Sequence, residues 1–97
     1  MDVDEARGRA VRKLREIETE QHPLRLDDSR GPQQRAWCWI FPFDSVRYFQ
    51  TGRFLDSVVS GPIVVNKDGT DTWVAGTGLP LDEWLDEYAR RNGYSRA

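Results

Sequence analysis

The sequence has very few of the side chains that most often bind metals or form covalent intermediates: its 97 residues include one cysteine, Cys38, and one histidine, His22. A single cysteine excludes an intramolecular disulfide and is typical of a protein in a reducing compartment. One cysteine and one histidine fall short of a zinc site, and no metal-ligand spacing accompanies them. We therefore expect neither a metal nor another cofactor.

Long apolar runs and a charge excess of one sign are also missing. No stretch reaches the ~20 apolar residues of a membrane span, and the charged amino-terminal segment lacks the apolar region of a secretory signal. The net charge is −2, and acids are interspersed with the arginines, so there is no basic stripe of the kind that nucleic-acid-binding proteins use. We expect a single cytoplasmic domain over residues 1–97, with neither membrane nor nucleic acid as a partner.

Hydrophobic periodicity predicts a helix at each end of the chain. Residues 2–20 carry a narrow, alanine-rich apolar stripe at helical spacing, and Asp2 with Glu5 resembles a capping box. Residues 80–93 carry a broader apolar stripe, and Pro80 suits the first turn of that helix. The arginines of the first helix fit a solvated face better than a binding site for an anion.

Between these helices the sequence predicts about four short strands, at residues 24–26, 36–43, 63–65 and 72–74. Pro42 cannot donate a ladder hydrogen bond and should lie at a strand end or a bulge. Gly69 is placed for the turn of a hairpin, and Gly52 for the left-handed end of a short helix capped by Asp44 or Ser45. No connection resembles a crossover helix. We therefore predict an α+β fold, a small antiparallel sheet of about four strands with N- and C-terminal helices packed on it.

Few residues suggest catalysis. Cys38 lies mid-strand between Trp37 and Trp39, and alternation places both tryptophans on the face opposite the thiol. That environment favours a buried core cysteine over a nucleophile, which would need a nearby base or cation. His22 has no nucleophile at motif spacing, so a surface loop fits it better than a general base. We assign no catalytic residue; an enzyme that uses Cys38 remains the third interpretation and requires an accessible thiol.

Two features favour a role in binding. Acids on the polar face of the last helix form i, i+4 pairs. Solvent surrounds both members of each pair, so their pKa values are not pulled apart as acid–base catalysis requires. An acidic face of this kind can instead dock a basic protein. Trp73 follows the hairpin turn, and an exposed tryptophan is a common interface anchor.

Four segments occur in an order and spacing that resemble the YrhB-like family, also called the immunity protein 35 family. They are "WCWIF", "SVRYFQTG", "GPIVVNKDG" and "GTGLPLDEWLDEY", which together span Trp37 to Tyr88. The sequence departs from the family pattern at Asn66, where an aspartate is common, at Trp73, which is bulkier than usual, and in a long loop over residues 27–35.

The resemblance implies a small, non-catalytic cytoplasmic protein of a bacterial polymorphic toxin system. Such a protein is encoded beside a secreted toxin and would bind and block its toxin domain. We expect acidic steering and aromatic anchoring to act through surface residues; the candidates are Asp44, Arg47, Trp73, Asp82, Glu83, Asp86 and Glu87. The alternative is a small chaperone or adaptor, which would need a contiguous exposed apolar patch. The oligomeric state is not predicted.

Overall fold

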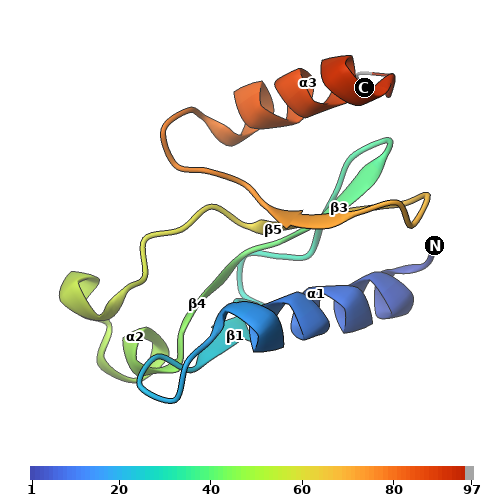
Figure 1. Ribbon diagram of the computed structural model, residues 1–97. Helices are drawn as coiled ribbons and strands as arrows, with labels where there is room; N and C mark the ends of the chain where they lie inside the picture. Colours follow the sequence, from blue (N-terminus) through green and yellow to red (C-terminus); the bar gives the residue numbers. More distant parts are fainter. Residues whose placement is uncertain (96–97) are drawn as a thin grey trace.

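In the computed structural model, which describes residues 1–95, two helices lie on opposite faces of a four-stranded antiparallel sheet (Figure 1). The helices are α1 (Val3–Ile17) and α3 (Leu81–Asn92). The strand order is β2-β3-β5-β6, and the strands are β2 (Gln33–Gln34), β3 (Cys38–Phe41), β5 (Ile63–Asn66) and β6 (Thr72–Val74). The predicted α+β class, with a helix at each end packed on antiparallel strands, is confirmed.

A second, two-stranded sheet was not predicted. It pairs β1 (Leu24–Leu26) with β4 (Phe43–Ser45) in antiparallel register. The predicted strand over residues 36–43 divides at Pro42, which has no N–H for a ladder, so that β3 and β4 belong to different sheets. After β4 come the short helix α2 (Val46–Thr51) and the 3₁₀ turn η1 (Phe54–Asp56).

Local hydrogen bonds explain where the helices and turns begin and end. The Asp2 side chain caps α1 by accepting from the Glu5 N–H at 2.8 Å, and the Ser45 hydroxyl caps α2 by accepting from the Tyr48 N–H at 2.9 Å. Gly52 ends α2 with a φ of 69°, and Gly69 in the β5–β6 turn has a φ of 79°. Both glycines occupy the left-handed region, as predicted.

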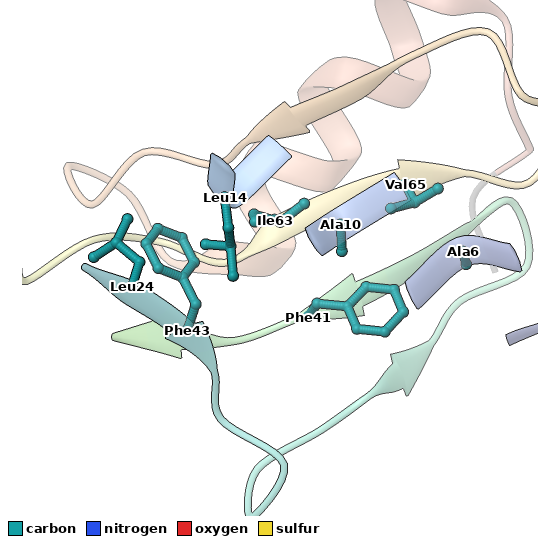
Figure 2. Close-up of a cluster of buried hydrophobic side chains, with 8 residues drawn as sticks. All are labelled: Ala6, Ala10, Leu14, Leu24, Phe41, Phe43, Ile63 and Val65. Atoms are coloured by element: carbon teal, nitrogen blue, oxygen red, sulfur yellow. The ribbon is translucent and has the colours of Figure 1, made fainter. Parts of the chain in front are cut away.

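One half of the core lies between α1 and the sheet (Figure 2). The helix contributes Ala6, Ala10 and Leu14, at a spacing of four residues, and small alanine side chains let its backbone approach the strands closely. The strands contribute the larger side chains of this cluster, which are Leu24, Phe41, Phe43, Ile63 and Val65.

The other half of the core lies between the sheet and α3. Because successive strand side chains point to opposite faces, Cys38, Ile40 and Val64 turn away from α1 and pack with Leu85 and Ala89 of α3. Two layers of helix thus bury both faces of a sheet whose central strands are apolar on each side.

The tryptophans of the aromatic strand separate, contrary to the predicted alternation. Trp37 precedes β3 and packs in the α3 cluster with Cys38, whereas Trp39 packs against the α1 cluster. The placement of both indoles opposite the thiol was therefore wrong, because the strand pleat begins only at Cys38.

Candidate functional site

Cys38 cannot serve as a nucleophile in this fold. Its side chain is fully buried, and burial raises the pKa of the thiol to about 11, while Arg35 and Lys67 counteract this effect only in part. The thiol is therefore protonated at neutral pH, and reagents cannot reach it. The interpretation of Cys38 as a catalytic residue is wrong. Within residues 1–95, no His, Cys, Asp and Glu side chains gather in a group that could hold a metal, and no helix is long and apolar enough to cross a bilayer.

The predicted acidic face of α3 is present but partly compensated by arginines of the same chain. Asp82 forms an ion pair with Arg35 at 3.2 Å. Glu87 forms ion pairs with Arg90 at 2.7 Å and with Arg91 at 3.0 Å, and the hydrogen bonds from Arg90 are the main cause of a lowered Glu87 pKa. The remaining predicted acids, Glu83 and Asp86, are exposed on the same helix.

Trp73 belongs to an aromatic stack, which we define as Trp37, Trp73, Tyr88 and Tyr94. Its ring lies 4.3 Å from that of Tyr88, nearly parallel to it. On the far side of the stack, Trp37 lies 5.5 Å from Tyr88 and 4.9 Å from Tyr94. The stack connects the β6 end of the sheet to α3, and it leaves Trp73 half-buried, less accessible than its predicted role requires.

Asn66 is the polar centre of this stack. Its side chain is fully buried, and its Nδ2 group donates to the Tyr88 hydroxyl at 3.0 Å and to Thr70 Oγ1 at 3.1 Å. Its Oδ1 atom accepts from Trp73 Nε1 at 3.1 Å. The one donor of Trp73 is therefore used inside the protein.

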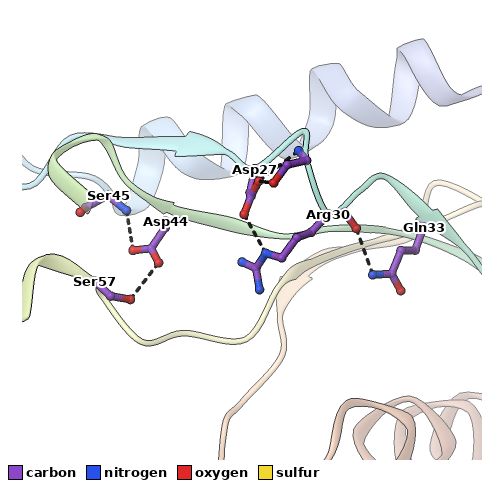
Figure 3. A network of polar contacts seen from close by, with 7 residues as sticks. Asp27, Arg30, Gln33, Asp44, Ser45 and Ser57 are labelled. Atoms are coloured by element: carbon purple, nitrogen blue, oxygen red, sulfur yellow. Dashed lines mark hydrogen bonds and ion pairs between the residues drawn. The ribbon is translucent and has the colours of Figure 1, made fainter. Parts of the chain in front are cut away.

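Asp44 is buried and not on the surface, where we had expected it. Only 7% of the residue is exposed, and its carboxylate accepts from the Ser45 N–H at 2.7 Å and the Ser57 hydroxyl at 2.8 Å (Figure 3). It also accepts from the Val58 N–H at 2.9 Å. The placement of Asp44 among surface contact residues is corrected accordingly. Asp44 ties the chain that follows α2 back to β4.

The segment that Asp44 holds, residues 53–60, is the most apolar exposed part of the described chain; we call it the 53–60 loop. Leu55 is 92% exposed and Phe54 73% exposed, and the other exposed apolar side chains of the loop are Val58 and Val59. The sequence analysis assigned this segment no role. The only signal was a group of apolar residues that follow neither a helix nor a strand period.

The 53–60 loop separates two open grooves. One, of about 620 Å³, has Phe54, Val59 and Arg30 among its lining residues, and the other, of about 360 Å³, has Leu55, Val58 and Arg47. Arg47 thus lies where a partner could reach it, as expected for a contact residue, but beside the loop and not beside α3. The predicted contact residues therefore divide between two separate surfaces.

The model of a protein family described as immunity protein 35 matches residues 4–87, most of the chain. The matched part begins in α1 and ends in α3, so it includes the sheet, the 53–60 loop and the acids of α3. No curated protein and no solved structure shows a significant match to the chain.

Proposed function

The chain belongs to the immunity protein 35 family, and from that premise we propose that it binds the toxin domain of a cognate bacterial toxin and neutralises it by contact. The match over residues 4–87 is the observation that carries this proposal. Members of an immunity family act by occupying the toxin, typically without catalysis, so the burial of the one thiol is compatible with the proposal. We place the protein in the cytoplasm, where a toxin domain that entered the cell would be met.

Two surfaces are available for this contact. The first is the one predicted from the sequence, with Trp73 and the α3 acids Asp82, Glu83, Asp86 and Glu87. It would attract a basic toxin surface and raise the rate of association. The second is the 53–60 loop with Arg47 beside it.

Co-expression tests the function whichever surface is used. The toxin domain encoded beside the gene of this chain is induced in a bacterial host, alone or together with the chain. We expect growth to be restored only with the chain, and the two purified proteins to form a stable complex. A member of the same family that is paired with a different toxin is the matched control and should not restore growth. Undiminished killing in the presence of the folded chain would contradict the proposal.

A chaperone or adaptor role stays as the second candidate, because the 53–60 loop supplies the exposed apolar side chains that this role requires. Its test is the aggregation of a heat-denatured enzyme such as citrate synthase, followed by light scattering. A chaperone should suppress aggregation, and replacement of Phe54 and Leu55 by serine should remove the effect. Aggregation that proceeds as in buffer alone would eliminate this candidate.

A further inference from the structure

Four apolar side chains of the 53–60 loop remain exposed to water, where they add nothing to the hydrophobic stabilisation of the domain. Phe54 and Leu55 are consecutive, and Val58 and Val59 follow a few residues later in the same loop. Contiguous exposed apolar side chains mark interaction sites, and a few anchor side chains that become buried at such a site carry most of the binding energy.

The loop is held in shape by polar groups. Asp44 accepts from Ser57 and from the Val58 N–H, and Asp56 accepts from the Thr51 hydroxyl at 2.6 Å. Val59 has a φ of 47°, a conformation that a β-branched residue adopts only when its surroundings enforce it. A loop with its conformation already set loses little entropy when a partner binds.

Around the loop, the arginine side chains are much more exposed than the carboxylates with which they pair. In the ion pair of Arg30 with Asp27, 61% of the arginine side chain is exposed but only 10% of the aspartate. In the pair of Arg47 with Asp56 the values are 75% and 15%. Arg53, at the start of the loop, is exposed and makes no ion pair within residues 1–95. A partner therefore meets an apolar tip whose most exposed charges are guanidinium groups, two of them paired with less exposed carboxylates.

A second copy of the chain fits this surface poorly. In a twofold dimer the same patch faces itself, so arginines would meet arginines around the apolar contact. Like charges opposed across an interface reduce affinity. The charge pattern calls for a different protein with carboxylates around an apolar pocket.

We propose that the 53–60 loop is the docking tip of this protein and that it enters an apolar pocket bordered by carboxylates on the cognate toxin domain. This rests on the function proposed above. Phe54 and Leu55 fill the pocket, while Arg30, Arg47 and Arg53 pair with its acidic border.

The test measures binding of the purified toxin domain from the neighbouring gene by biolayer interferometry. Replacement of Phe54 and Leu55 by serine should weaken binding roughly 30-fold or more, the loss typical of central apolar anchors. Because both side chains face solvent, the melting temperature should stay within about 2 °C of wild type. The matched control is Leu79→Ser, an exposed apolar side chain outside the loop, which should bind as wild type does. Arg53→Glu should slow association about threefold to tenfold at low salt, with a smaller effect at high salt.

Two results would overturn the docking tip while leaving the proposed function intact, and a third would overturn the function on which the docking tip rests. If the serine variant binds as wild type does while Glu83→Lys with Asp86→Lys abolishes binding, the interface is on α3. If sedimentation shows a dimer that the serine variant cannot form, a second copy covers the loop. If the wild-type chain itself does not bind the toxin domain, the proposed function fails first.

Discussion

Replacement of Asp44 by alanine should destabilise the whole domain. The carboxylate is buried and accepts three hydrogen bonds, from Ser45, Ser57 and Val58, at 2.7–2.9 Å. Each donor left without an acceptor costs about 1–3 kcal/mol when water cannot replace the lost partner. Ser57 and Val58 lie in a partly buried position where water replaces some of this loss. We therefore expect a decrease of about 2–4 kcal/mol in the free energy of unfolding.

Urea unfolding followed by tryptophan fluorescence measures this decrease, since the chain has 4 tryptophans. For a domain of this size a loss of 1 kcal/mol lowers the melting temperature by about 4–8 °C, so a loss of about 2–4 kcal/mol should lower it by about 8–32 °C. Asp28→Ala is the matched control, because Asp28 is exposed and pairs with Arg7 only at the surface; it should change stability by less than about 0.5 kcal/mol. Asp44→Asn keeps one acceptor oxygen, so its loss of stability should lie between those of Asp28→Ala and Asp44→Ala.

A second measurement locates the effect. The Val58 amide, bonded to Asp44 in the native protein, should exchange with deuterium much faster in Asp44→Ala. Amides of the central strands β3 and β5 should exchange faster only to the extent that the free energy of global unfolding falls. Suppose instead that Asp44→Ala unfolds at the same urea concentration as wild type and loses only affinity for the toxin domain. Asp44 would then be an interface residue, as the sequence-based prediction had it, and the reasoning from burial would be refuted.

Four further substitutions test other parts of the fold by urea unfolding. Asn66→Ala should lower the free energy of unfolding by about 2–4 kcal/mol. Trp73 Nε1 loses its acceptor, and removal of the buried amide leaves a cavity at the centre of the aromatic stack. Burial raises the pKa of Cys38 from an ordinary 9.0 to about 11, so the unfolded chain loses its thiol proton first. Stability should therefore fall between pH 9 and 11 more steeply in wild type than in Cys38→Ala. Gly8→Ala adds a methyl group to open space on α1 and should stabilise by about 0.5–1 kcal/mol, whereas Gly61→Ala places Cβ against backbone atoms and should destabilise by about 1–3 kcal/mol.

Much of the secondary structure could be predicted because its determinants lie within a few residues of one another. The Asp2 cap, the Ser45 cap and the left-handed glycines Gly52 and Gly69 each act across one turn of chain. The hairpin of β5 and β6 follows from two β-branched runs and the turn between them. The order of motifs along the chain was likewise sufficient to indicate the family that the match over residues 4–87 shows.

The candidate site was less predictable, because exposure depends on segments that are distant in the sequence. Asp44 resembles a surface acid beside a helix start, and only the return of Ser57 and Val58 to β4 buries it. Phe54 and Leu55 resemble core residues by composition, yet within residues 1–95 no helix or strand covers them.

The sequence by itself therefore determined the three main helices, most of the strands and the family, because short-range hydrogen bonds and apolar periods depend on residues close together in the chain. It did not indicate β2, which lies within the region expected to be a loop. The sequence placed Pro42 at a strand end or a bulge, but only the tertiary structure decided that the strands on either side of it belong to two sheets. Only the tertiary structure decided, too, that Asp44 is an internal anchor and that the apolar side chains of the 53–60 loop are exposed. Burial is a property of the surface that remains after every segment has packed, and neighbours along the chain do not specify it.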